Sequence, residues 1–552
     1  MAAARSVGME AEVAALRGRF AAGGTRGAEW RAAQLRGILR MAAEAEAEVC
    51  RALHADLAKP YTESYEAPKK TLRTLTLLVN WEIWNERNRR IFQHKELSTV
   101  NWEIWNERNR RIFQHKELST RSLLTKIKEE AKTWSRIALV KSSCKFALKN
   151  LKKWMKPQKV TAPLMTFPST ARVAAEPLGV VLIISAWNYP FLLSIDPIIG
   201  AIAAGNAVVL KPSEVAPATS SLLAELLPRY VDGSCIKVVE GGVAETTTLL
   251  EQKWDKIFYT GNGKVGRIVM ASAAKHLTPV VLELGGKCPV VVDSNVNLHV
   301  TAKRIAAGKW GCNNGQACIS PDFIITTKSF APKLLEALEK VLEKFYGRDP
   351  LRSSDLSRIV NSNHFNRLKN LMDDENVSNK IVFGGQRDEH QLKIAPTIFM
   401  DVPLDSEIMK EEIFGPLLPI ITVDKIHESF ALINSMTKPL AAYLFTKDSK
   451  LQEQYEVAIS AGGMLVNDTA VHLTNQYLPF GGVGESGMGA YHGRFSFEAF
   501  SHKKAVLVRR FAGEAAARYP PYSPAKLKIL RGVLKGNLGA MIQAILGFPR
   551  GK

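Results

Sequence analysis

Short apolar segments alternate with helix-forming segments from Gly179 onward, and this alternation constrains the fold more than any other feature. Residues 179–186 (GVVLIISA) are a continuous apolar run, 190–204 have helical spacing, and 207–210 form a second apolar run that Pro212 stops. The rhythm continues through segments 216–230, 236–239, 243–250 and 256–260. Apolar runs without polar alternation are typical of strands buried on both faces. The sequence therefore predicts an α/β protein with a doubly wound parallel sheet.

A second series of apolar segments follows the glycine pair Gly285-Gly286 and predicts a second α/β domain. Its predicted strands are residues 290–292, 323–326, 419–423, 442–445 and 464–466. A chain of 552 residues exceeds what one hydrophobic core supports, so two or three domains are expected. A domain boundary near the glycine pair would place a ligand site between the two domains.

Two polar segments near this boundary carry groups that suit covalent catalysis. Glu283 ends an apolar run just before Gly285, and Cys318 lies in the polar loop Asn313–Ser320 (NNGQACIS). A thiol nucleophile and a nearby general base are the minimum for covalent catalysis at a carbonyl. The simpler alternatives are an inert buried cysteine and a solvated carboxylate. The glycines and polar residues around both groups favour the catalytic interpretation.

Candidate binding residues fall where the predicted parallel strands end. Asn188, Lys211 and Gly261 each follow a strand, and ligands of doubly wound sheets bind beyond these ends. Residues 261–266 (GNGKVG) open a predicted helix, whose N-terminus suits a pyrophosphate. The spacing differs from GxGxxG, so the loop alone is a weak motif.

The formal net charge of +21 raises the question of a nucleic-acid partner. Residues 503–552 hold eleven Lys/Arg against one Glu, a net +10, and residues 66–137 hold sixteen against nine acidic residues, a net +7. The rest of the chain is therefore near +4, only mildly basic, and no nucleic acid is expected as a partner.

Cysteine usage and the N-terminus bear on the compartment. The six cysteines show neither a disulfide framework nor metal-ligand spacing, so we expect a reducing compartment and no metal. Residues 1–12 lack an apolar stretch, and no segment reaches the about 18–20 apolar residues of a membrane span. A cytoplasmic protein is expected.

An identical 21-residue repeat, VNWEIWNERNRRIFQHKELST, occupies residues 79–99 and again 100–120. The surrounding segment 66–137 carries five of the ten tryptophans. Two copies are too few for a repeat array, which needs about three. The segment is similar to fragments of plant retroelement-derived reading frames, and we interpret it as an insertion. Whether it is a gene-model artefact or a real insertion stays open, as does a basic, aromatic nucleic-acid-binding role.

The C-terminal tail has apolar residues at helical spacing with basic residues among them. Leu527, Leu530 and Leu534 begin this pattern, which continues to Leu538, Ile542 and Ile545. A basic amphipathic helix suits an anionic membrane surface, and packing on the protein or on a dimer partner is an equal alternative.

Several separate motifs resemble those of the aldehyde dehydrogenases, in particular the class 3 plant fatty aldehyde dehydrogenases. They are the segments 186–191 (AWNYPF), 411–416 (EEIFGP), 491–493 (YHG) and 500–504 (FSHKK). The resemblance spans about residues 8–65 and 138–525. It implies an NAD-binding domain, an α/β catalytic domain and a small oligomerisation β-extension. The implied parts are an N-terminal helical part of the NAD-binding domain (1–65 and 138–162), the insertion (66–137), oligomerisation strands (163–177 and 490–510), the NAD-binding domain (178–285), the catalytic domain (286–489) and the basic tail (511–552).

The resemblance also implies roles for individual residues. Cys318 would be the nucleophile, Glu283 the general base and Asn188 the oxyanion donor. The implied coenzyme-binding residues are Lys211, Glu214, Gly261, Asn262, Gly263, Gly266, Leu284, Glu412 and Phe414. NAD is the expected coenzyme, with NADP as an alternative, because a carboxylate at Glu214 repels a 2′-phosphate. The family often has Ser in place of Asn262, which leaves phosphate contact there open.

The implied function is oxidation of medium- or long-chain, lipid-derived aldehydes to carboxylic acids by a homodimer. The thiohemiacetal and thioester intermediates would form on Cys318. Two alternatives compete with it. One is a non-catalytic basic protein that binds nucleic acid or anionic membrane through the insertion and tail, and the other is thioester or ester hydrolysis without a coenzyme.

Overall fold

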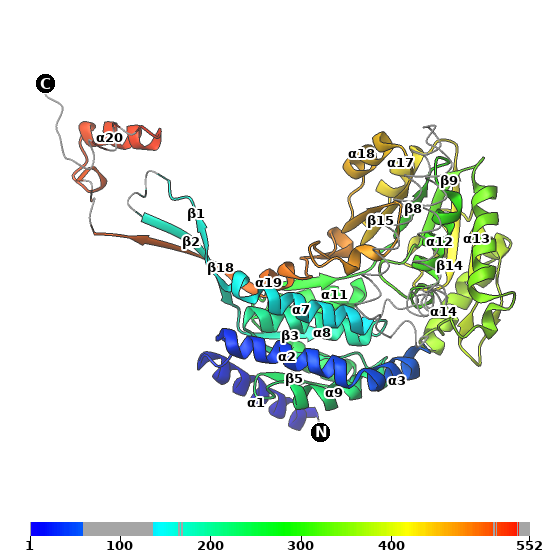
Figure 1. Cartoon of the computed structure of the whole chain (residues 1–552), viewed down its shortest axis with the longest axis horizontal. Helices are drawn as coiled ribbons and strands as arrows, with labels where there is room; N and C mark the ends of the chain where they lie inside the picture. Colours follow the sequence, from blue (N-terminus) through cyan, green and yellow to red (C-terminus); the bar gives the residue numbers. More distant parts are fainter. Residues whose placement is uncertain are drawn as a thin grey trace, which may run out of the picture.

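The computed structural model describes residues 2–58, 136–163, 166, 169–511, 514, 516–537, 539 and 542. The predicted insertion at 66–137, with its tandem repeat, lies outside these residues except for 136 and 137, which begin helix α7 (Arg136–Met155). Figure 1 shows a body of two α/β lobes and a thin β-arm that projects away from it.

The first lobe is built on a six-stranded sheet with the order β17-β7-β6-β3-β4-β5. Its strands are β3 (Val180–Ile184), β4 (Ala207–Lys211), β5 (Ile236–Val238), β6 (Lys256–Thr260), β7 (Val280–Glu283) and β17 (Gly487–Met488). All pairs are parallel except that of β17 with β7. Every residue of β3 and β4 is buried, as continuous apolar runs predict. The predicted doubly wound parallel sheet is confirmed.

Helices cover this sheet and carry the chain from one strand to the next. They are α1 (Ala2–Ala21), α2 (Ala28–Glu44), α3 (Glu46–Leu57), α8 (Pro190–Ala204), α9 (Pro217–Tyr230), α10 (Val243–Glu251) and α11 (Gly263–Ala274). All of α8 is buried, because it lies between the strands β3 and β4 and the helices α2 and α7. It begins two residues after Asn188, so its packing fixes the position of that side chain.

The second lobe contains a seven-stranded sheet with the order β10-β13-β14-β9-β8-β15-β16. Its strands are β8 (Pro289–Val292), β9 (Phe323–Thr327), β10 (Ile381–Phe383), β13 (Thr397–Met400), β14 (Leu417–Val423), β15 (Ala441–Phe445) and β16 (Gly463–Val466). Only β10 is antiparallel to its neighbour. Five of these strands coincide with predicted apolar runs, and β10 and β13 are additions that the sequence did not reveal.

The remaining elements of this lobe are mostly helical. They are α12 (Leu298–Lys309), η2 (Asn313–Gly315), α13 (Ala331–Tyr346), η3 (Pro350–Arg352), α14 (Ser362–Asp373), α15 (Glu375–Ser378), β11 (Arg387–Asp388), β12 (Lys393–Ile394), α16 (Glu407–Lys410), α17 (Glu428–Asn434), α18 (Ser449–Ala458), η4 (Val471–Thr474) and η5 (Gly484–Ser486). Two of them position the site described below: α12 ends just before η2, and α16 ends just before Glu411.

The projecting arm is a three-stranded antiparallel sheet with the order β1-β2-β18. It consists of β1 (Gln158–Val160), β2 (Ser169–Pro177) and β18 (Ser501–Arg509). Strand β1 falls in the range 138–162, which we predicted to be helical. Helix α7 ends at Met155 because Pro157 disfavours helix at the residue before it, and the chain then becomes extended. The range 490–510, predicted as strand, also contains helix α19 (Arg494–Ala499).

The tail forms η6 (Ala516–Arg518) and helix α20 (Pro524–Leu534), which Figure 1 shows at the far end of the arm. The predicted helical pattern runs on toward Ile545. Helix α20 ends at Leu534, Gly536 follows with a φ of +72°, and Leu538 and Ile545 lie outside the described residues. A left-handed glycine is a common helix terminator. Within the described part of the chain, no helix is long and apolar enough to cross a membrane.

Candidate active site

The loop that carries Cys318 is held in an uncommon backbone conformation. Asn313, Asn314 and Gly315 have φ values of +53°, +50° and +81°. Asn tolerates the left-handed region better than most residues, and Gly occupies it without strain. A Cβ on Gly315 would lie 2.0 Å from the carbonyl oxygen of Gly415. The NNG sequence therefore permits both a tight turn and close contact with a second loop.

Buried amides fix this loop to its surroundings. The Gln316 Nε2 donates to the carbonyl oxygens of Asn313 at 3.1 Å and Arg358 at 2.9 Å, and its Oε1 accepts from the Val360 N–H at 3.0 Å. Asn314 and Gln316 are fully buried, whereas Cys318 is partly exposed. The loop thus presents the Cys318 thiol from a rigid support.

The structure brings Asn188 into contact with the Cys318 loop. The Asn188 Nδ2 donates to the Gln316 carbonyl oxygen at 3.1 Å, and the Asn313 Nδ2 donates to the Asn188 carbonyl oxygen at 3.2 Å. Asn188 is only 3% exposed. Its side-chain amide is therefore held against the Cys318 loop by the residue two positions before Cys318.

Glu283 is a buried carboxyl group at the end of β7. It is 3% exposed, and neither carboxyl oxygen has a hydrogen-bond partner among the described residues. Burial raises the pKa of Glu283 well above its ordinary value. Burial thus favours the protonated form of this side chain over the ionised form.

The turn after Glu283 reaches the Cys318 loop through Cys288. The Cys288 Sγ donates to the Cys318 carbonyl oxygen at 3.3 Å, and the Cys288 carbonyl accepts from the Asp322 N–H at 2.8 Å. Cys288 is fully buried, and burial raises its thiol pKa, as expected of a structural cysteine. All six cysteines are thiols rather than disulfides.

A third loop, residues 411–416, lies against the same turn. A Cβ on Gly285 would fall 1.9 Å from the Glu412 Oε2, so a larger residue at position 285 would displace that carboxylate. The Gly286 N–H donates to Glu412, while burial and the nearby Asp322 raise the pKa of Glu412 to about 8. Phe414 has a φ of +49° and makes an edge-on contact with Trp187, with 5.3 Å between ring centroids.

A buried ion pair that the sequence did not reveal anchors this third loop. The Lys287 Nζ donates to the Asp322 Oδ2 at 2.5 Å and to the carbonyl oxygens of Ile408 and Glu411 at 2.8 and 3.1 Å. The Asp322 Oδ1 accepts from the Ile413 N–H at 3.0 Å. One pair thus ties together the segments that carry Glu283, Cys318 and Glu412. Its only sequence signal is a charged residue beside each of two buried strands.

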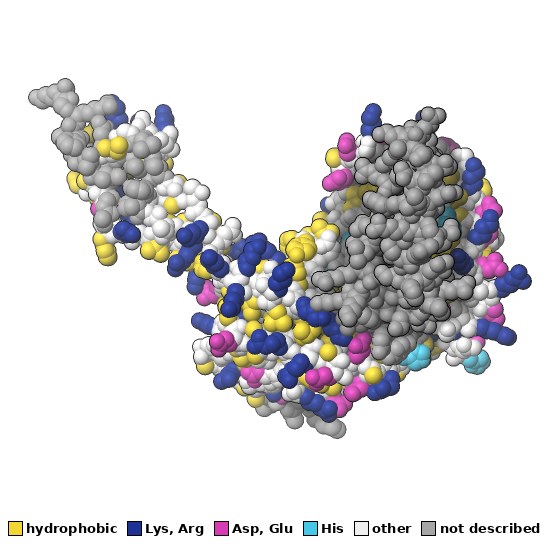
Figure 2. All heavy atoms as spheres, viewed as in Figure 1, with side chains coloured by type: hydrophobic (Ala, Val, Ile, Leu, Met, Phe, Trp, Pro, Cys, Tyr) yellow, Lys and Arg dark blue, Asp and Glu magenta, His cyan; other side chains and the backbone are white. Residues whose placement is uncertain are grey.

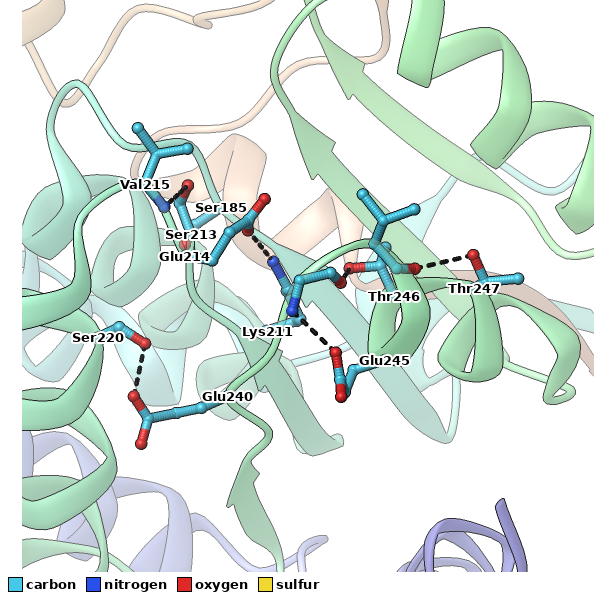
Figure 3. Close-up of polar contacts among 12 residues, drawn as sticks. Ser185, Lys211, Ser213, Glu214, Val215, Ser220, Glu240, Glu245, Thr246 and Thr247 are labelled. Atoms are coloured by element: carbon cyan, nitrogen blue, oxygen red, sulfur yellow. Dashed lines mark hydrogen bonds and ion pairs between the residues drawn. The ribbon is translucent and has the colours of Figure 1, made fainter. Parts of the chain in front are cut away.

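Lys211 and Glu214 lie at the C-terminal end of β4. The Lys211 Nζ pairs with the Glu214 Oε2 at 2.5 Å, with the lysine buried and the carboxylate half-exposed. Figure 3 shows two more carboxylates in the segments that follow β5: Glu240 accepts from Ser220 at 2.8 Å, and Glu245 accepts from the Gly242 N–H at 2.9 Å. The end of this sheet is therefore rich in carboxylates.

The predicted phosphate loop joins β6 to α11. The Asn262 Oδ1 accepts from the Val265 N–H at 2.9 Å and caps the helix, which begins at Gly263. The Gly261 N–H donates to the Glu283 carbonyl at 3.0 Å, and Gly266 packs against the side chain of Leu284. The residues Gly261, Asn262, Gly263, Gly266 and Leu284 therefore gather at one helix N-terminus.

Buried polar atoms beside this helix favour a polar ligand. Thr260 pairs with Glu283 across β6 and β7, and the Thr260 hydroxyl also has no hydrogen-bond partner among the described residues. Hydroxyl, carboxyl and helix N-terminus together fit a ligand with ribose and phosphate groups. No group of acidic residues, histidines or cysteines in the described ranges could hold a metal ion.

Known proteins that are similar in sequence or in structure to this chain are aldehyde dehydrogenases. The family model described as Aldehyde dehydrogenase family matches residues 102–506. The chain is 64% identical over 411 residues to aldehyde dehydrogenase family 3 member H1 of Arabidopsis thaliana, across 74% of this chain and 85% of the relative. It is 52% identical over 535 residues to family 3 member I1, chloroplastic, of the same plant, across 97% of this chain and 85% of the relative. The solved structure titled substrate bound state of Staphylococcus aureus AldH is 35% identical, with a TM-score of 0.80, and covers 95% of this chain and 99% of that chain.

Proposed function

The chain belongs to the aldehyde dehydrogenase family, which oxidises aldehydes to carboxylic acids with NAD or NADP, and from this premise we propose that Cys318, Asn188 and Glu283 carry out the reaction. The observation that carries the proposal is the set of direct contacts among three loops. Asn188 bonds to the Cys318 loop, Cys288 joins that loop to the Glu283 turn, and Gly285 seats Glu412.

Cys318 is the proposed nucleophile. Its thiolate attacks the aldehyde carbon, a carbon–sulfur bond forms, and the carbonyl oxygen becomes an oxyanion. The Asn188 side-chain amide and the Cys318 main-chain N–H are the proposed donors to this oxygen. Because both belong to the fixed loop assembly, they need no reorganisation when the charge develops.

The proposed coenzyme site runs from the end of β4 to the loop at 411–416. Lys211 and Glu214 would hold the adenine ribose, the N-terminus of α11 the pyrophosphate, and Glu412 and Phe414 the nicotinamide ribose. When bound there, the coenzyme would supply a hydride acceptor, so that the thiohemiacetal carbon on Cys318 could lose its hydride and become the carbonyl carbon of a thioester. The contact between Phe414 and Trp187, the residue before Asn188, would place the nicotinamide end near the oxyanion site.

Glu283 is the proposed base for hydrolysis of the thioester. It would take a proton from a water molecule, whose oxygen then attacks the thioester carbon and releases the carboxylic acid and the Cys318 thiolate. Burial raises the pKa of Glu283, which makes its conjugate base stronger. The absence of a hydrogen-bond partner for either carboxyl oxygen in the described residues is consistent with space for that water.

We propose that NAD is preferred over NADP. Glu214 lies beside Lys211, and Glu240 and Glu245 follow the neighbouring strand β5 (Figure 3). Three carboxylates near the ribose end disfavour the extra negative charge of a 2′-phosphate. Lys211 by itself would favour the 2′-phosphate. NADP is therefore proposed as the weaker coenzyme.

The proposed assembly is a homodimer formed through the β-arm. Leu507 and Val508 of β18 are about half exposed, and Phe511 is fully exposed. A small sheet gains stability when it packs against further structure, and a second copy would supply it. Sedimentation at equilibrium should give twice the chain mass, and Leu507→Glu should shift it toward the monomer.

The substrate range and compartment also remain proposals. The resemblance to family 3 favours medium- and long-chain aliphatic aldehydes, so kcat/KM should rise from acetaldehyde to decanal.

Exposed Leu527 and Leu534 on the basic helix α20 suit a peripheral contact with an anionic membrane. Sedimentation of the protein with phosphatidylserine vesicles tests this contact. We propose the cytoplasm as the compartment. One relative is named chloroplastic, and imaging a fluorescent fusion of this chain would distinguish the cytoplasm from the chloroplast.

The primary test is turnover of hexanal with NAD by the full chain, followed by NADH absorbance. Cys318→Ala should abolish turnover, whereas Cys312→Ala, six residues earlier on the same segment, should retain most of it. Turnover that survives Cys318→Ala would refute the assignment. A chain with no turnover that bound RNA or vesicles in a salt-sensitive way would instead support the non-catalytic alternative.

A further inference from the structure

The C-terminal end of helix α3 is a point of contact between the two lobes (Figure 1). The last carbonyl oxygens of an α-helix have no partner inside the helix, and two of those in α3 accept from a residue of the second lobe. The Arg358 Nη2 donates to the Ala55 carbonyl at 2.5 Å and to the Asp56 carbonyl at 2.8 Å. A cation at this end also interacts favourably with the helix dipole. One guanidinium group thus bonds the second lobe to the first.

The main chain around Arg358 holds the loop that carries Cys318. The Arg358 carbonyl accepts from the Gln316 Nε2 at 2.9 Å, and the Val360 N–H donates to the Gln316 Oε1 at 3.0 Å. The Ser357 carbonyl accepts from the Asn314 Nδ2 at 3.2 Å. The segment at 357–360 therefore bonds to the loop through two buried amide side chains, and its own side chain at position 358 reaches the other lobe.

Gln316 is also bonded to the first lobe by a direct route. Its main-chain carbonyl accepts from the Asn188 Nδ2 at 3.1 Å, and Asn188 lies just before helix α8 of the first lobe. Its side chain reaches the first lobe by the second route, through Arg358 and α3. A loop that is held at one point can rotate about that point, whereas attachment at two points restricts the rotation. The contact through Arg358 supplies the second point.

We propose that Arg358 is a positioning residue that fixes the Cys318 loop relative to Asn188 by bonding the segment 357–360 to the end of α3. This inference rests on the proposed roles of Cys318 and Asn188. Arg358 acts through Gln316 and needs no contact with the substrate or the coenzyme. Because a displacement of about 1 Å between reacting groups can lower a rate about 100-fold, loss of this bond should slow acylation of Cys318.

The test is the pre-steady-state rate of NADH formation by the full chain at saturating NAD and hexanal. Arg358→Met should lower this rate about 10- to 100-fold, while the Kd of NAD and the KM of hexanal change by less than about threefold. Arg358→Lys keeps a cation that can donate to one of the two carbonyls, so it should lose less than Arg358→Met, and it allows the comparison if Arg358→Met does not fold. A rate that stays within about threefold of the parent in both variants, or a loss that weaker NAD binding explains, would overturn the inference.

Arg31→Met is the matched control, because it also removes a guanidinium group that bonds to main-chain carbonyls. Arg31 is buried, and it donates from Nη1 to the Ala203 carbonyl at 3.0 Å and from Nε to the Thr25 carbonyl at 3.4 Å, all within the first lobe. Arg31→Met should lower the melting temperature at least as much as Arg358→Met and should keep the parent rate of NADH formation. The rates are measured well below the lowest melting temperature. An equal loss of rate in Arg31→Met would assign the effect to general destabilisation and overturn the inference.

A double-mutant cycle with Asn188→Ala separates failure of this inference from failure of the proposed function. If Arg358 acts by aligning the Cys318 loop with Asn188, adding Arg358→Met to Asn188→Ala should lower the rate by a smaller factor than it does in the parent. A parent-like rate in Asn188→Ala would refute the role of Asn188 itself. A slow Asn188→Ala chain in which Arg358→Met again causes its full loss would overturn the inference alone.

Discussion

Replacement of Gly315 by alanine should lower both stability and activity. The loss of stability comes from backbone strain at position 315, and the loss of activity comes from separation of the loops that carry Gly315 and Gly415. Gly315 has a φ of +81°, and a left-handed conformation costs an alanine about 1–2 kcal/mol. Its new Cβ would lie 2.0 Å from the Gly415 carbonyl oxygen, whereas Cβ contacts below 3.0 Å are essentially never seen. The two loops must therefore separate by about 1 Å, a displacement that can cost about 100-fold in rate.

Gly23→Ala provides the matched control. Gly23 has a φ of +79°, and a Cβ there would meet nothing within 4 Å. Both variants should lose about 1–2 kcal/mol of stability from the left-handed conformation, seen as a lower melting temperature. Only Gly315→Ala should lose about 100-fold in kcat/KM for hexanal. If both variants kept parent activity, the contact between residues 315 and 415 would not position the nucleophile.

Three further outcomes follow from the same geometry. Asn188→Ala should lower kcat by about 10²–10³, or about 2.7–4 kcal/mol of transition-state stabilisation; a loss below threefold in steady-state assays would exclude it as the oxyanion donor. Glu214→Gln should raise kcat/KM with NADP relative to NAD by about tenfold, and an unchanged ratio would place selectivity elsewhere. Because burial raises the pKa of Glu283, thioester hydrolysis should slow as pH falls through that pKa and the base becomes protonated. Single-turnover rates should show this acid limb in the parent chain and lack it in Glu283→Gln.

The sequence predicts the two parallel sheets because their strands are continuous apolar runs with clear ends. Residues 190–204 and 256–260 are predicted with the same bounds that α8 and β6 have. Strands β1 and β10 have only three residues each, all exposed in β1 and exposed or half-buried in β10, and give no such signal. Their existence depends on pairing with distant strands.

The candidate site could be predicted only in part, because many of its contacts join residues far apart in the chain. Cys318 and Glu283 stand out from local chemistry, whereas Asn188 and Glu412 were identified by resemblance. The ion pair of Lys287 with Asp322 spans 35 residues. No local pattern predicts such a contact, because it arises only when β8 and β9 pair side by side in the second sheet.

Trapping the acyl group on the chain identifies the sulfur atom that acts as the nucleophile. Glu283→Gln, mixed with hexanal and NAD and quenched in acid, should accumulate a hexanoyl thioester. Trypsin releases residues 310–328 as one peptide that contains both Cys312 and Cys318, and fragmentation assigns the modified sulfur. The acyl group should lie on Cys318 and should not form without NAD. An acyl group on Cys312 or Cys288, or turnover without any adduct, would contradict it.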